Sequence, residues 1–129
     1  MDKNRKEKII EIIKYISQLM IDLSESNKEF NNYVKDIYSK YIVDNDDYNI
    51  DLTIPYSNLL DHQLKFLGKL NYYKNEFIKS IEELKRVSVT TSSLYELSAN
   101  DTINKIDAQI TWLKTSINKT NELFTEYLK

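Results

Sequence analysis

His62 is the only histidine in the chain of 129 residues, and histidine is the side chain best suited to acid–base chemistry near neutral pH. Asp61 precedes it, so the pair has the residue types of a general base and its orienting carboxylate. The chain has no cysteine, and a zinc site containing one histidine then needs three carboxylates, which is rare. A di-iron bundle needs a glutamate three residues before the histidine, where this chain has Leu59. We interpret His62 as a surface or core-flanking residue, and we predict no catalytic residue and no metal ligand.

Four aspartates gather in residues 44–54, where carboxylate oxygens are the ligands that calcium prefers. An EF-hand loop also needs a glycine at its sixth position and a glutamate at its twelfth. Counted from Asp44, these positions hold Asn49 and Pro55, and a count from Asp47 fails in the same way. We expect a solvated acidic loop, with a weak cation site as the alternative. The four aspartates are Asp44, Asp46, Asp47 and Asp51.

The remaining catalytic patterns are excluded by composition or context. Phosphate-binding loops and serine nucleophile elbows need several glycines, and the chain has only Gly68. Glu25 and Glu29 lie one helical turn apart, but a catalytic carboxylate pair needs a cleft with two different environments. We interpret this pair as a solvated helix face. The sequence therefore predicts a protein that is not an enzyme and that takes no cofactor and no small-molecule substrate.

Basic residues recur along residues 65–86 near Tyr72 and Tyr73, and basic patches with interleaved aromatic residues occur on some nucleic-acid-binding surfaces. Glu76, Glu82 and Glu83 dilute this patch. The whole chain has 18 basic and 20 acidic residues and a net charge of −2, whereas nucleic-acid binding relies on basic excess. We expect no nucleic-acid partner. The basic residues of the patch are Lys65, Lys69, Lys79 and Arg86.

One glycine and one proline are too few for the turns and bulges of sandwiches, barrels or doubly wound sheets. Apolar residues instead recur every three or four positions, which is typical of helices that bury one face. The spacing predicts three long helices at about 4–43, 56–86 and 93–128, with an acidic connecting loop over 44–54. Short links favour antiparallel neighbours. We therefore expect a single all-α domain over 1–129, folded as an elongated antiparallel up-down-up bundle.

The first helix has a seam of residues reached by alternating steps of four and three. Its members are apolar except for Asn27, and a lone asparagine at such a position can fix the register of packed helices. Asn27 is therefore our candidate register residue, and the alternative is a partly solvated residue at a helix start. The seam comprises Ile9, Ile13, Ile16, Met20, Leu23, Asn27, Phe30, Val34, Ile37 and Tyr41.

Two capping-box patterns bear on the helix boundaries. Ser26 and Glu29 match the first pattern, which divides the first helix near 24–26 and gives a four-helix bundle as the alternative fold. We favour one continuous helix because the seam keeps its phase across this point. Ser93 and Glu96 match the second pattern, and a run of poor helix formers over 87–93 precedes it. We therefore place the start of the last helix at Ser93.

The N-terminal half of the first helix is apolar around more of its circumference than one core face requires. Either the other helices enclose this half, or its extra side chains bind a partner helix or a second copy of the chain. Trp112 flanks the seam of the last helix, and tryptophan is common at binding hot spots. The candidate partner-binding residues are Ile10, Ile12, Tyr15, Leu19, Ile21 and Trp112.

These features predict a helical protein–protein interaction module, acting as an adaptor, a targeting partner, a small stoichiometric inhibitor or a self-associating protein. The alternative is peripheral binding to a membrane surface, because basic residues flank the apolar ones at the start of the first helix. Charged residues interrupt that apolar stretch, which argues against a signal peptide, and no run is long enough for a membrane span. With no cysteine in the chain, we expect a cytoplasmic protein.

Overall fold

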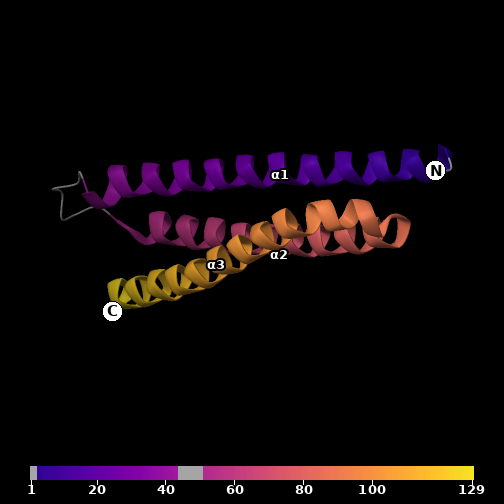
Figure 1. The fold of residues 1–129 in the computed structure, drawn as a ribbon. Coiled ribbons are helices and arrows are strands. Elements are labelled where there is room, and N and C mark those ends of the chain that lie inside the picture. Colours follow the sequence, from indigo (N-terminus) through magenta and orange to yellow (C-terminus); the bar gives the residue numbers. More distant parts are fainter. Residues whose placement is uncertain (1–2, 44–50) are drawn as a thin grey trace.

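The computed structural model describes residues 3–43 and 51–129, and these residues are almost entirely helical. Helix α1 spans Lys3–Ile37 and continues as a π-helical segment, η1, over Tyr38–Val43. Helix α2 spans Thr53–Val87, and helix α3 spans Val89–Leu128. The helices run up, down and up, so α1 and α3 point in the same direction (Figure 1). The predicted elongated three-helix bundle is confirmed.

Helix α2 is the central element of the bundle. It packs against both α1 and α3, whereas α1 and α3 make few contacts with each other. Helix α3 also runs obliquely, so its C-terminal end lies farther from α1 than its first turns do (Figure 1). The core follows the α2 seam, and each fully buried leucine or phenylalanine contributes about 1.5–3 kcal/mol relative to exposure. The largest fully buried side chains are Phe77, Leu70, Leu84, Ile106 and Leu113.

Helix α1 is continuous through residues 24–27, so the four-helix alternative is wrong. Ser26 does not cap a helix start there. Its side chain is buried, and its Oγ atom lies 3.0 Å from the hydroxyl oxygen of Tyr73 on α2. The hydroxyl that completes the capping-box pattern in the sequence is therefore used in a contact between two helices.

The seam of α1 differs from the predicted one by one residue in every second step. Ile12 and Leu19 are buried in the core, with exposed fractions of 6% and 3%. Ile13 is only partly buried and Met20 is 44% exposed. Both residues of each pair are apolar, so the spacing alone did not decide between steps of four and three and steps of three and four. The buried residues of α1 are Ile9, Ile12, Ile16, Leu19, Leu23, Ser26, Phe30 and Ile37.

The junction between α2 and α3 is a single residue, Ser88, with extended backbone angles of φ −155° and ψ 106°. Its amide donates to the carbonyl oxygen of Leu84 at 2.7 Å, which ends α2. Its Oγ accepts from the amide of Thr91 at 3.2 Å, which caps the start of α3. The predicted turn over 87–93 and the predicted helix start at Ser93 are therefore wrong. One serine supplies both caps, so the poor helix formers that follow it become the first turn of α3.

Helix α2 begins at Thr53, three residues earlier than predicted. The carboxylate of Asp51 accepts a 2.9 Å hydrogen bond from the amide of Thr53, and Pro55 lies within the first turn, where it removes no helical hydrogen bond. Ile54 is therefore helical and not part of the predicted connecting loop. The predicted loop residues 44–50, with Asp44, Asp46 and Asp47, lie outside the described residues.

Candidate interaction surface

The α1 residues predicted to bind a partner do not form one surface. Ile12 and Leu19 point into the core, so the prediction that they bind a partner is wrong for the folded bundle. Ile10 and Ile21 are exposed on the outer side of α1, and they lie about three turns apart. Tyr15 lies on a third side, against α2. The apolar residues in the N-terminal half of α1 are thus divided between the core face and separate exposed positions.

Tyr15 contacts the outer edge of α2. Burial of its hydroxyl raises the pKa of Tyr15 to about 12, and the neighbouring Tyr72 hydroxyl and the charge of Glu76 add to this shift. The side chain as a whole is still 42% exposed, because the ring lies along the junction of the two helices. Tyr15 therefore helps to hold α1 on α2.

Asn27 links α1 to α3. Its Oδ1 accepts a 2.8 Å hydrogen bond from Nε2 of Gln109, and both side chains are partly buried. This hydrogen bond places Asn27 opposite Gln109, and it joins two helices that make few other contacts with each other. The predicted role of Asn27 in register has a defined partner here, and the role itself stays a prediction.

Four apolar side chains lie on the same sides of α1 and α3 as this hydrogen bond, and together they form what we call the α1–α3 face. Met20 and Ile13 lie seven and fourteen residues before Asn27, so they occupy the same side of α1. Trp112 follows Gln109 by three residues and adjoins it on α3. Leu94 precedes Trp112 by about five full turns and so lies on the same side of α3. The apolar members of the face are Ile13, Met20, Leu94 and Trp112.

The most exposed large apolar side chains of the face belong to α3. Trp112 is 59% exposed and Leu94 is 78% exposed. Leu97, one turn after Leu94, is 84% exposed and borders the face. The sequence prediction included Trp112 and missed both leucines. They lie in the segment where a turn and a helix start were expected, and the seam of the last helix was counted only from Ile103 onward.

Three lysines lie in line with the α1–α3 face, and two carboxylates of α3, Asp101 and Glu126, lie in line with it as well. Lys6 lies seven residues before Ile13, and Lys105 and Lys119 lie seven residues on either side of Trp112. Lys105 forms a 3.0 Å ion pair with Asp101. At 3.6 residues per turn, the carboxylates of α1 all fall on a different side of that helix from Met20. They are Glu7, Glu11, Asp22, Glu25, Glu29 and Asp36.

His62 packs between α1 and α2. Its ring stacks on Tyr33 with centroids 3.6 Å apart and planes at 9°, and its Nδ1 donates to the carbonyl oxygen of Asn58 at 2.9 Å. These contacts fit the predicted core-flanking residue. Within residues 3–43 and 51–129, no group of three or more histidine, aspartate or glutamate side chains is placed to hold a metal ion.

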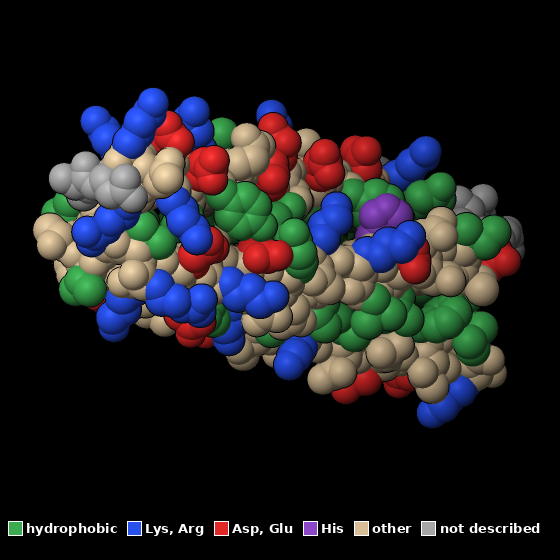
Figure 2. All heavy atoms as spheres, turned by 90° about the vertical axis from the view of Figure 1, so that its right-hand side faces the viewer, with side chains coloured by type: hydrophobic (Ala, Val, Ile, Leu, Met, Phe, Trp, Pro, Cys, Tyr) green, Lys and Arg blue, Asp and Glu red, His purple; other side chains and the backbone are tan. Residues whose placement is uncertain are grey.

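The charges of α2 are balanced locally. Lys65 pairs with Asp61 at 2.9 Å, and Lys74 pairs with Asp107 of α3 at 2.7 Å. On the side of the molecule that shows His62, basic and acidic side chains are interspersed (Figure 2). Asp51, the described member of the acidic group, has a lowered pKa because Thr53 donates hydrogen bonds to its carboxylate. Its contacts are those of a helix start.

Comparison of the chain with known protein families, with curated proteins and with solved structures finds no match. Among the described helices, none has a stretch both long and apolar enough to cross a membrane.

Proposed function

We propose that the protein is a non-enzymatic interaction module that binds an acidic amphipathic helix of a partner protein along the α1–α3 face. The observation that carries this proposal is the exposure of Leu94 and Trp112 on one side of α3. Apolar side chains of this size that share one face are typical of binding surfaces. Tryptophan in particular is enriched among the residues that contribute most to binding.

The arrangement of the face favours a helix as its occupant. Ile13 and Met20 are one heptad apart on α1, and Leu94 and Trp112 share a side of the parallel helix α3. A helix placed along α1 and α3 meets both rows with apolar residues at intervals of three and four, as in helix-in-groove recognition. The Asn27–Gln109 hydrogen bond lies between the rows and offers polar atoms to the same occupant.

The charges favour an acidic occupant. Lys6 and Lys119 lie in line with the apolar rows and outside the ion pairs of the described residues, whereas Lys105 is paired with Asp101. The carboxylates of α1 lie elsewhere on that helix. Complementary charge at the rim of an interface speeds association and disfavours wrong partners. A helix whose apolar stripe is bordered by aspartate and glutamate therefore complements this face.

The burial of the apolar face of α1 in the core counts against the membrane alternative. An interfacial helix must insert its own apolar face into the bilayer. On α1 that face is made of Ile12, Leu19 and their neighbours, which are buried in the core of a bundle in which α1 packs mainly against α2. Membrane binding through this helix requires α1 to leave the bundle and expose the core.

The proposal is tested by selecting phage-displayed helical peptides against the full chain and measuring the affinity of enriched peptides by fluorescence anisotropy. We expect enriched peptides with apolar residues at intervals of three and four and with flanking acidic residues. Leu94→Gln combined with Trp112→Gln should weaken their binding at least tenfold, or about 1.4 kcal/mol. Leu64→Gln combined with Leu128→Gln, which alters exposed leucines elsewhere, should leave it unchanged.

Circular dichroism checks that both double variants stay helical. Failure to enrich any peptide, or equal weakening in both double variants, overturns the proposal. A dimer in light scattering that Leu94→Gln and Trp112→Gln abolish assigns the face to a second copy and also overturns it. Flotation of the protein with anionic vesicles, lost in the same variant, assigns the face to a membrane with the same consequence.

A further inference from the structure

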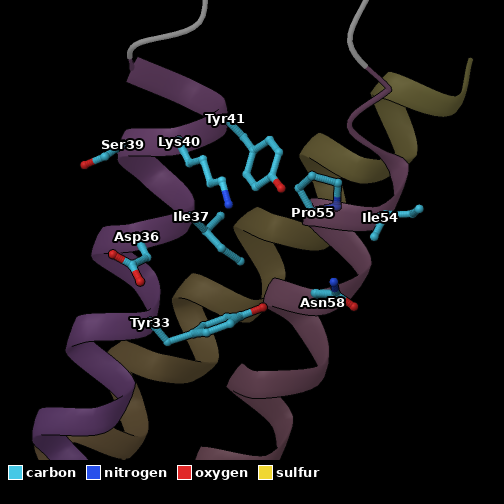
Figure 3. Close-up of a pocket in the computed structure, with 9 residues that line it drawn as sticks. All are labelled: Tyr33, Asp36, Ile37, Ser39, Lys40, Tyr41, Ile54, Pro55 and Asn58. Carbon is cyan, nitrogen blue, oxygen red and sulfur yellow. The ribbon is translucent and has the colours of Figure 1, made fainter.

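A cavity of about 650 Å³ lies at the end of the bundle, between the last turns of α1 with η1 and the first turns of α2. Cavities that bind small molecules usually measure about 300–1,000 Å³. The side chains that reach the space between the two helices are drawn in Figure 3. They come from α1 (Tyr33, Ile37), from η1 (Lys40, Tyr41) and from α2 (Pro55, Asn58).

The apolar part of the lining is fixed by the core. Ile37 and Pro55 are both buried, and they line the cavity from opposite helices. Tyr41 projects from η1 toward Pro55 and closes the space at one end (Figure 3). A π-helical segment joins residues five apart, so it is wider than an α-helix, and such segments are frequent at functional sites.

Tyr33 forms the opposite end of the cavity, and a contact outside the cavity holds its ring in place. Its ring stacks on His62, which is itself held by the carbonyl oxygen of Asn58, another lining residue. The hydroxyl of Tyr33 points across the gap toward α2 (Figure 3). Desolvation raises the pKa of Tyr33, and the charge of Asp61 raises it further, so its hydroxyl stays protonated as a hydrogen-bond donor.

Lys40 supplies the positive charge of the cavity. Its ammonium group points into the space between α1 and α2 (Figure 3). Its Nζ lies 5.8 Å from the centre of the Tyr41 ring, and the ion pairs of the described residues do not include it. Asp36 and Ser39 also line the rim, but they are drawn on the side of α1 that faces away from α2 (Figure 3).

We propose that this cavity binds a small organic carboxylate with an apolar body. The ammonium group of Lys40 receives the carboxylate, with the hydroxyl of Tyr33 as a further donor. Ile37, Pro55 and the ring of Tyr41 contact the apolar body. One lysine matches one negative charge, so a carboxylate suits the site better than a phosphate dianion. This site is separate from the α1–α3 face and does not depend on its function.

The test titrates octanoate into the full chain and follows backbone amide signals by NMR. We expect saturable shifts confined to residues 33–41 and 54–58, and no comparable shifts with acetate, which lacks the apolar body. Octanol should bind at least tenfold more weakly than octanoate, because it lacks the charge that Lys40 pairs with.

Lys40→Gln should weaken octanoate binding at least tenfold, which is the loss expected for a charge-assisted hydrogen bond. The matched control is Lys35→Gln, because Lys35 is an exposed lysine of α1 outside the cavity lining. Circular dichroism establishes that both variants remain folded. Equal affinity of the two variants for octanoate overturns the role of Lys40.

Three other results overturn the proposal. If octylammonium binds and octanoate does not, the carboxylate of Asp36 determines the charge preference. If octanol binds as tightly as octanoate, the cavity is an apolar space without anion recognition. If none of these compounds shifts residues 33–41 and 54–58, the cavity is not a binding site. Each of these results leaves the peptide experiment on the α1–α3 face unaffected.

Discussion

The side chain of Gln109 on α3 donates a 2.8 Å hydrogen bond to the side chain of Asn27 on α1, across the two helices that make the fewest contacts in the bundle. Both helices are held mainly by α2, whose apolar seam does not specify how α1 and α3 are aligned along their length. A directional polar contact forms only when its two residues are opposite one another, so we expect this hydrogen bond to favour one alignment of α1 and α3.

We expect Asn27→Ala and Gln109→Ala each to lower the free energy of unfolding by about 1 kcal/mol, the usual net value of a protein hydrogen bond. The double variant should lose less than the sum, with a coupling energy of about 0.5–1 kcal/mol. Urea unfolding followed by circular dichroism measures all three. Asn31→Ala, one turn further on an exposed position of α1, serves as the control. Strictly additive losses from the two single variants contradict the pairing.

The register of α1 gives a second prediction. Leu19→Ala should cost about 2–5 kcal/mol in the free energy of unfolding, because it leaves a cavity at a position that is 3% exposed. Met20→Ala should cost less than about 1 kcal/mol, because that side chain faces solvent at the α1–α3 face. Denaturant titrations of the two variants compare neighbouring residues of the same helix. A larger loss from Met20→Ala restores the seam predicted from the sequence.

The seam of α2 was predictable because charged residues directly precede its buried apolar members, as Lys65 precedes Phe66 and Lys69 precedes Leu70. Phe66, Leu70 and Leu113 are buried as expected. On α1 the pairs Ile12–Ile13 and Leu19–Met20 are apolar at both positions, so either phase is consistent with the pattern. Tertiary contacts decide between them. One such contact is between the side chains of Ser26 and Tyr73, which lie 47 residues apart in the chain.

The candidate sites were less predictable than the fold. The sequence indicated Trp112, but the exposure of Leu94 depends on α3 beginning at Val89, which the hydrogen bonds of Ser88 determine. The cavity combines Lys40 and Tyr41 from one helix end with Pro55 and Asn58 from the next. Spacing along the chain carries no information on that proximity, because residues 44–50 separate the two groups.

Ser88 gives a third prediction, because it provides the caps of two helices. Ser88→Ala should lower the free energy of unfolding by about 1–2 kcal/mol, since the amide of Thr91 then loses its side-chain acceptor at a buried position. Ser93→Ala, at the helix start predicted from the sequence, should change it by less than about 0.5 kcal/mol. Thermal and urea unfolding of the two variants test this. Equal losses of stability in the two variants contradict the assignment of the α3 cap to Ser88.

The fourth prediction concerns stability at high pH. The pKa of Tyr15 is about 12 in the folded chain, against 10.0 for an unperturbed tyrosine. Between pH 10 and pH 12 the unfolded chain therefore releases the phenolic proton while the folded chain retains it. Because the folded state then binds more protons, the contribution of this group to stability is complete below pH 10 and falls as the pH rises to 12.

Tyr15→Phe should accordingly lose less stability than the unchanged protein between pH 10 and pH 12, as measured by urea midpoints across that range. Glu76→Gln should produce a smaller change in the same direction, because it removes a charge that raises the pKa of Tyr15. Glu82→Gln, an exposed carboxylate of α2 outside this contact, is the control. Parallel pH profiles for the unchanged protein and Tyr15→Phe contradict the raised pKa of Tyr15 and show that its hydroxyl is solvated.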